Sequence, residues 1–279
     1  MSHWSVARAW SGVALPLAAV VAVLLVGFAH VDGSAPAVAA VFAGTLVLLA
    51  MGWGVARSEA IVLRAVSATP LPPGESPDLV TTVAATARRL RIPPPHLSIS
   101  RTATPFALVV GRSRDRATLC VSSGLLADLD AEGLLTVVAH QLTHAAGPLL
   151  VPRSVASAWA AAVLRTTDGV PLLSVANPVG LAVRHLGVTV AQQTEVDEGT
   201  ARSMADPDAL PRVLARLDAR TGRSPLVPTG PLVAVAGLMT TSPFGNDVRA
   251  ARLAGQPDTG ARLLRLQQSG VRRLAHPQR

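Results

Sequence analysis

Two histidines spaced four residues apart are the residues of this sequence best suited to chemistry. They are His140 and His144, within the stretch VVAHQLTHAAG from Val137 to Gly147. Residues four apart lie on the same face of a helix, so both imidazoles can point at one metal ion. Zinc accepts imidazole nitrogens, and its catalytic sites combine three protein ligands with a water. The spacing therefore indicates a metal site, and the alternative is two core or surface histidines held by hydrogen bonds.

The residue after the first histidine determines what such a site could do. Zinc proteases with the pattern HExxH carry a glutamate there, which acts as general base, whereas this chain has Gln141. A carboxamide can hydrogen-bond a water but has no group that titrates near neutral pH. General acid–base catalysis contributes about 10²–10⁴-fold, so we expect hydrolysis to be weakened by at least that factor. Metal binding would not suffer, because this residue is not a ligand.

The histidines need elements that position them and a third ligand from elsewhere. The run AEGLLTVVAHQLTHAA predicts a long apolar helix that ends near Gly147 and Pro148. Glu195 lies on a helical stretch after a hydrophobic segment, and it is the best candidate for the third ligand. Metal ligation would thus join two helices that are distant in the sequence.

Shorter elements precede the histidine helix. Residues 76–92 predict an amphipathic helix, because apolar residues recur on one face. Three strand candidates follow at 96–100, 106–111 and 117–123, separated by polar turns. We expect an α+β fold that is mainly α, with a small β-sheet beside the helices.

Two uncharged apolar stretches lie near the start of the sequence, at residues 11–31 and 35–56. A helix needs about 20 apolar residues to cross a bilayer, so each stretch is long enough. They predict a two-helix transmembrane hairpin within residues 1–66. Arginines lie outside the hairpin rather than in its loop, which places both ends and the following domain in the cytoplasm. The alternative for the first stretch is a cleaved signal peptide.

A Pro/Gly-rich linker at 67–76 separates the hairpin from a domain at 77–255. Inside that domain, residues 148–191 form a hydrophobic insertion that prolines and arginines interrupt. Interruptions at this density favour buried or interfacial helices over further membrane spans. An Arg-rich tail at 256–279 is expected to be helical.

The composition agrees with a membrane protein. Charged residues make up 15% of the chain and hydrophobic residues 49%, whereas a soluble domain has roughly 25% charged residues. The net charge is +8, but the arginines are scattered and aromatic residues are only 3%, which argues against nucleic-acid binding. Attraction to an anionic membrane surface explains the charge better. We expect an integral protein of a bacterial cytoplasmic membrane, with the lipid bilayer and membrane-protein or peptide segments as partners.

Three short elements carry a family resemblance. They are Pro105-Phe106-Ala107, then Ser123-Gly124-Leu125-Leu126 with Leu129, then Leu135, Val138 and Ala139 beside His140 and His144. In this order they resemble the HtpX / CAAX prenyl protease family of membrane zinc metallopeptidases. The resemblance implies a gluzincin-like metallopeptidase domain and one zinc per chain, bound by His140, His144 and Glu195.

Two further positions depart from the family pattern besides Gln141. Gly199 stands where the family has an aspartate beside the metal site, and Ser242 stands where it often has a histidine. Glu198 or Asp197 could replace the lost carboxylate; otherwise both are solvated charges on a helix surface.

Three losses together predict a membrane-bound HtpX-like zinc metallopeptidase homologue that is catalytically impaired or inactive. One alternative is an active zinc endopeptidase in which another group, such as Glu198 or Glu132, supplies the base. The other is a non-enzymatic membrane scaffold with neither metal nor chemistry.

Overall fold

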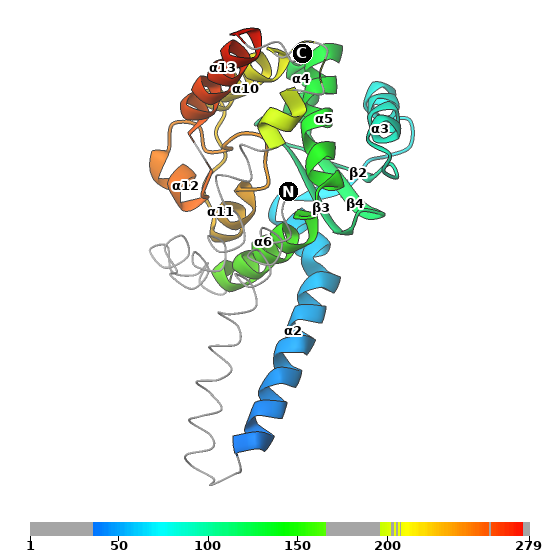
Figure 1. The fold of residues 1–279 in the computed structure, drawn as a ribbon, viewed down its shortest axis with the longest axis vertical. Helices are drawn as coiled ribbons and strands as arrows, with labels where there is room; N and C mark the ends of the chain where they lie inside the picture. The colour runs from blue at the N-terminus through cyan, green and yellow to red at the C-terminus, as the bar shows by residue number, and fades with distance from the viewer. Residues whose placement is uncertain are drawn as a thin grey trace.

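The structure is a computed structural model that shows mainly helices around one small sheet (Figure 1). It describes residues 36–165, 196–201, 204, 206, 208–256 and 258–275. The predicted first membrane span, at 11–31, lies outside these residues, and so does most of the hydrophobic insertion. The predicted two-helix hairpin is therefore described only by its second helix.

Helix α2 (Pro36–Ala65) projects from the rest of the molecule as a stalk (Figure 1). Its part from Gly44 to Ala65 is long and apolar enough to cross a bilayer, and only 17% of its most apolar window is buried. Arg57 is the first charged residue along this helix, so the uncharged part matches the predicted second span at 35–56. The rest of the helix continues into the domain, where Val62 is fully buried.

The sheet has four strands in the order β1-β2-β4-β3. They are β1 (Ala68–Pro70), β2 (His96–Ser100), β3 (Ala107–Ser113) and β4 (Arg116–Ser122). β2 and β4 are parallel, and the other two pairings are antiparallel. The three predicted strands are confirmed within a few residues, whereas β1 falls inside the predicted linker and forms an edge of the sheet.

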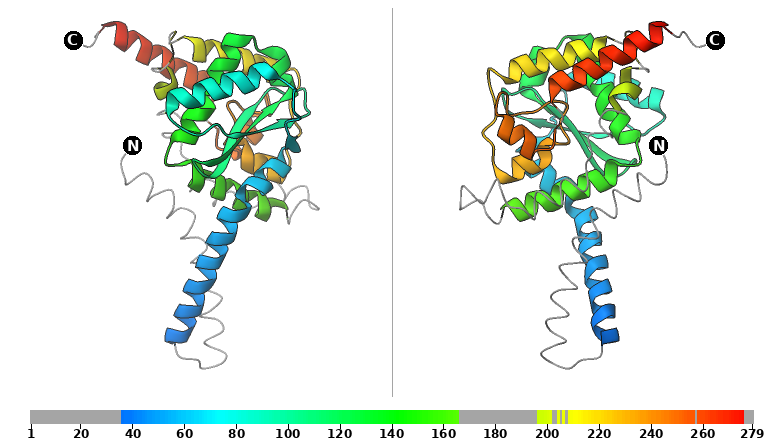
Figure 2. Two further views of the ribbon diagram at one scale, coloured as in Figure 1. Left: turned by 90° about the vertical axis from the view of Figure 1, so that its right-hand side faces the viewer. Right: turned by 60° about the vertical axis from the view of Figure 1, so that its left-hand side comes forward.

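Helices cover both faces of the sheet (Figure 2). α3 (Pro77–Leu90) and α5 (Ala131–Ala146) lie on one face, where Val109 and Leu119 join their hydrophobic cluster. The end of α2, α6 (Leu150–Arg165) and α11 (Gly230–Ala236) lie on the other, with Leu108 and Val110. Side chains alternate between the faces along β3, as expected for a strand buried on both sides.

Helix α5, which carries the histidine pair, has the predicted bounds. Asp130 precedes it, and its side chain accepts a hydrogen bond from the backbone N–H of Gly133 at 2.9 Å. Such a cap satisfies one of the free donors at a helix start. Short helix α4 (Ser123–Asp128) links β4 to α5, so the chain passes from the sheet into the histidine helix without a long loop.

The later helices close the domain on a third side. They are α10 (Ala209–Thr221), α12 (Val248–Leu253) and α13 (Thr259–Ala275). Leu266 of α13 is buried in one cluster with Leu210 and Leu214 of α10. Helix α13, within the predicted tail at 256–279, packs against α10 (Figure 2).

Candidate functional site

Helix α5 places the three predicted site residues His140, Gln141 and His144 inside the protein. His140 and Gln141 have no exposed surface, and His144 is 7% exposed. The two imidazole rings meet edge to face, with centroids 4.9 Å apart. Because this helix is apolar on nearly every side, its one polar face is buried as well, and each polar atom there needs a partner.

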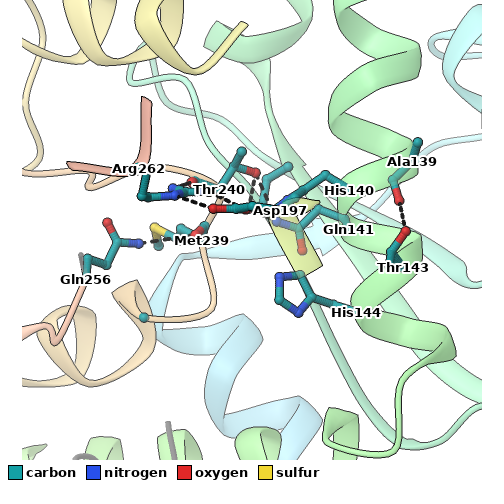
Figure 3. Close-up of polar contacts among 12 residues, drawn as sticks. Ala139, His140, Gln141, Thr143, His144, Asp197, Met239, Thr240, Gln256 and Arg262 are labelled. Atoms are coloured by element: carbon teal, nitrogen blue, oxygen red, sulfur yellow. Dashed lines mark hydrogen bonds and ion pairs between the residues drawn. The ribbon is translucent and has the colours of Figure 1, made fainter. Parts of the chain in front are cut away.

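Asp197 is the partner of the first histidine (Figure 3). Its Oδ1 lies 2.8 Å from Nε2 of His140, and the residue is only 2% exposed on a helical turn at 196–201. Burial alone would raise the pKa of Asp197, but hydrogen bonds from His140 and Arg262 outweigh it and hold the pKa at about 2. Asp197 is therefore an acceptor, and His140 donates its Nε2 proton to it.

Arg262 holds the same carboxylate from the opposite side (Figure 3). Its Nε donates to Oδ2 of Asp197 and its Nη2 to Oδ1, both at 2.8 Å. A third hydrogen bond, from Nη1, reaches the carbonyl of Thr240 at 2.6 Å. Such a two-point contact is the strongest geometry between arginine and a carboxylate. It joins α13 to the turn at 196–201 and, through His140, to α5.

Arg153 of α6 contacts the second histidine. Its Nη1 lies 2.5 Å from Nδ1 of His144, and its Nη2 donates to the carbonyl of Gly237 at 3.1 Å. Burial lowers the pKa of Arg153 to about 10, which still leaves it charged near neutral pH. A guanidinium has no acceptor, so Nδ1 of His144 must accept this hydrogen bond. Burial and the nearby Arg153 charge lower the pKa of His144 well below its usual range, so the ring is neutral with its proton on Nε2.

The side-chain amino group of Gln141 donates two hydrogen bonds within the protein. Its Nε2 donates to the carbonyl of Ala107 at 3.1 Å and to the hydroxyl oxygen of Thr240 at 2.9 Å. Oε1 of the same side chain is buried and has no hydrogen-bond partner in the part of the chain that the structure describes. The amino group therefore links α5 to β3 and to the segment after α11.

Curated relatives cover most of the chain. A protein named Protease HtpX homolog from Kineococcus radiotolerans is 29% identical over 240 residues, which are 78% of this chain and 82% of the relative. Proteins of the same name from Acaryochloris marina and Thermococcus kodakarensis are 29% and 27% identical, over 75% of this chain and 78% and 79% of their own. This chain is thus similar in sequence to proteins named as HtpX proteases. No family model matches it, and no solved structure matches it either.

The structure describes three of the four predicted metal-site residues. His140, Gln141 and His144 lie together on α5, whereas Glu195 is outside the described residues. Asp197 contacts His140, while Glu198, proposed for that role, is only half-buried on the same turn. The expectation that Asp197 is a solvated surface charge is therefore wrong.

Three further residues of the site do not stand out in the sequence. They are Arg153 in the hydrophobic insertion, Arg262 in the Arg-rich tail, and Thr240. A charged residue in a run as apolar as LLVPRSVASAWAAAVL is a signal that could have identified Arg153. No local signal distinguishes Arg262 from the other arginines of its helix.

The described residues do not fit zinc. No group of three His, Cys, Asp or Glu side chains among them could hold a metal ion. The acceptor Asp197 requires a proton on Nε2 of His140, and the donor Arg153 requires one on Nε2 of His144. A metal needs an imidazole lone pair from each histidine, and these hydrogen bonds do not leave two of them facing one point.

Proposed function

We propose that this chain is a membrane-anchored HtpX-like protein that no longer hydrolyses peptides and acts by binding membrane-protein or peptide segments. The HtpX relatives and the apolar, exposed helix α2 support attachment to a membrane. The arginines that follow its uncharged part favour a bacterial cytoplasmic membrane with the domain on the cytoplasmic side.

The hydrogen bonds of Gln141 carry the proposal. Its Nε2 donates to a carbonyl and to a hydroxyl oxygen that itself donates to the same carbonyl, that of Ala107. A carboxylate has no proton to donate, so a glutamate here would face the Ala107 carbonyl acceptor against acceptor. The surroundings thus suit a carboxamide, which supports a site that does without the general base.

The alternative of an active peptidase with another base has little geometric support. Glu132 lies eight residues before His140 on the same helix, about 12 Å along its axis at roughly 1.5 Å per residue. Its carboxylate is exposed and pairs with Arg212 at 3.2 Å. A general base must reach the reacting water directly or through one further water, so Glu132 is too distant.

A cleavage assay tests the loss of hydrolysis. The full chain, reconstituted in phosphatidylcholine vesicles, is incubated with unfolded casein and with a quenched fluorescent peptide library, with added zinc. We expect no cleavage above that of the His140→Ala variant. Cleavage by the wild-type chain that disappears in His140→Ala would refute the proposal.

The Gln141→Glu variant sharpens the test. If only the base were missing, this substitution would restore cleavage. We expect no restored cleavage, because the glutamate faces the carbonyl of Ala107. Restored cleavage would show that the rest of the catalytic machinery is intact. Binding is measured separately, by fluorescence anisotropy of a labelled apolar peptide of about 20 residues in the same vesicles.

A further inference from the structure

The charges around the histidine pair differ from those that a metal site needs. Arg153 and Arg262 are 5% and 4% exposed, so two guanidiniums are buried beside His140 and His144. A divalent cation placed between the imidazoles would meet both positive charges at low dielectric, where repulsion is much stronger than in water. Metal ligation instead favours carboxylates and neutral imidazoles near the ion.

Among the described residues, Asp197 supplies the one carboxylate in contact with the histidines, and both of its oxygens already accept hydrogen bonds. Oδ1 of Asp197 accepts from His140 and from Arg262, and Oδ2 accepts from Arg262. These contacts join α5, the turn at 196–201 and α13 at one point, as a shared metal ion would join its ligands. Nδ1 of His140 is buried and has no hydrogen-bond partner among the described residues, so one lone pair remains there.

We propose that the Arg262–Asp197–His140 network replaces the metal of the HtpX-like site, and that the folded protein binds no divalent cation at His140 and His144. The network then holds α5, the turn at 196–201 and α13 together, as a shared metal ion would. Arg153 holds His144 in place through its hydrogen bond to Nδ1. This inference does not depend on the loss of hydrolysis, because a site without metal and a site without base are separate properties.

Metal analysis of the wild-type chain tests the inference without any variant. The chain is purified in detergent with zinc, manganese and cobalt present and is then desalted. We expect inductively coupled plasma mass spectrometry to find no stoichiometric metal, and EDTA to leave the melting temperature unchanged. About one zinc per chain that is lost in His140→Ala/His144→Ala would overturn the inference.

Two variants test the structural role of the network. Asp197→Asn removes the charge that Arg262 needs, and Asp206→Asn removes the matching charge of an exposed pair with Arg212. We expect a melting temperature lowered by roughly 10 °C for Asp197→Asn and unchanged for Asp206→Asn. Equal melting temperatures for wild type and Asp197→Asn would contradict the structural role.

The metal and cleavage assays have separable outcomes. A metal-free protein that cleaves peptides would refute the proposed loss of hydrolysis and leave the metal-free site standing. A zinc-bound protein that cleaves nothing would refute the metal-free site and leave the loss of hydrolysis standing.

A second, independent observation concerns a groove between α2 and α6. It has a volume of about 350 Å³ and is lined by Trp53, Arg57, Ala60, Ile61, Arg64, Ala162 and Arg165. Its charged residues are all arginines, all exposed, and none forms an ion pair with a described residue. The groove therefore offers three cations beside an apolar wall.

The position of the groove relative to α2 indicates its ligand. Leu48 and Leu49, on the preceding turns, are 74% and 64% exposed, and Trp53 is 47% exposed. Along α2, apolar residues are followed by a tryptophan and then by arginines. This is the order expected where a helix crosses a membrane–water interface. We propose that the groove binds the phosphate of an anionic phospholipid, whose acyl chains lie along the exposed apolar side of α2.

Native mass spectrometry of the detergent-solubilised chain tests the lipid site. We expect retention of phosphatidylglycerol but not of phosphatidylcholine, and roughly tenfold weaker retention in Arg57→Gln/Arg165→Gln. The matched control is Arg88→Gln/Arg116→Gln, which removes two exposed arginines elsewhere and should retain the lipid.

Three results would overturn the lipid proposal. They are equal retention of both lipids, equal loss in both double variants, and displacement of the lipid by millimolar inorganic phosphate. The last would assign the groove to a free anion.

Discussion

Two aspartate–arginine pairs near the same stretch of chain have the same chemistry and opposite surroundings. In the pair of Asp197 and Arg262 the side chains are 3% and 4% exposed. In the pair of Asp206 and Arg212 they are 43% and 59% exposed. Water solvates the exposed charges almost as well as they solvate each other, whereas the buried charges depend on each other entirely. The same type of ion pair thus links parts of the fold where it is buried and contributes little to stability where it is exposed.

The largest effect is expected from Arg262→Met. Of the partners that the structure describes for the buried Asp197 carboxylate, only His140 would remain, and breaking a buried pair in this way costs about 3–5 kcal/mol. Denaturant unfolding of the detergent-solubilised chain, followed by tryptophan fluorescence, measures the loss. The double variant Asp197→Asn/Arg262→Met should be more stable than the sum of the two single losses, because neither charge is then left alone. Additive losses would show that the two residues are not coupled.

A smaller effect is expected from Gln141→Glu, which adds a buried charge without a cation in contact. We expect destabilisation by about 1–3 kcal/mol, because the carboxylate cannot donate to Ala107 or Thr240. Gln141→Met serves as the control and should cost less. It places no acceptor against the Ala107 carbonyl, which keeps its hydrogen bond from the N–H of Thr240 at 3.0 Å. A Gln141→Glu protein as stable as the wild type would disprove the acceptor conflict.

Thr240→Val tests the neutral part of the same network. The side chain is fully buried, and its hydroxyl accepts from Gln141 and donates to the carbonyl of Ala107. Valine has nearly the same shape, so the loss should be about 1 kcal/mol, near the net value of one hydrogen bond. The same unfolding experiment measures it. A loss as large as that of Arg262→Met would mean that burying this neutral hydrogen-bonded group matters as much for stability as burying the ion pair.

The smallest effect is expected from Arg212→Gln. Its partners Asp206 and Glu132 remain exposed to water, so we expect no measurable change in the unfolding midpoint. Repeating the measurement in high salt should leave wild type and variant equal, because screening removes what remains of the attraction. A clear destabilisation by Arg212→Gln would mean that the exposed pair contributes to stability as the buried pair does.

Local features were predictable from the sequence, and long-range ones were not. The bounds of α5 follow from its apolar run and the Asp130 cap, and the three strands follow from short apolar runs between polar turns. These signals depend on neighbours within a few residues. The hydrogen bonds of the site join residues far apart, such as Gln141 and Thr240, which are separated by 99 positions. No periodicity encodes such a contact.

Asp197 shows why one prediction failed. The stretch TEVDEG is acidic, and acidic stretches on a helix are usually solvated. Here the turn at 196–201 faces α5, and Arg262 compensates the charge that would otherwise keep Asp197 in water. The role of Glu195 and the predicted hairpin concern residues outside the described part of the chain and stay predictions.

The origin of Arg262 in α13 has a consequence for synthesis. His140, Asp197 and Arg262 leave the ribosome in that order, and Asp197 precedes Arg262 by 65 residues. At a translation rate of about 5–20 residues per second, Arg262 is synthesised roughly 3–13 s after Asp197. During that time burying Asp197 is unfavourable, so the nascent chain keeps this region open. The burial of Asp197 against His140 is therefore a late folding step, which requires that α13 has been synthesised.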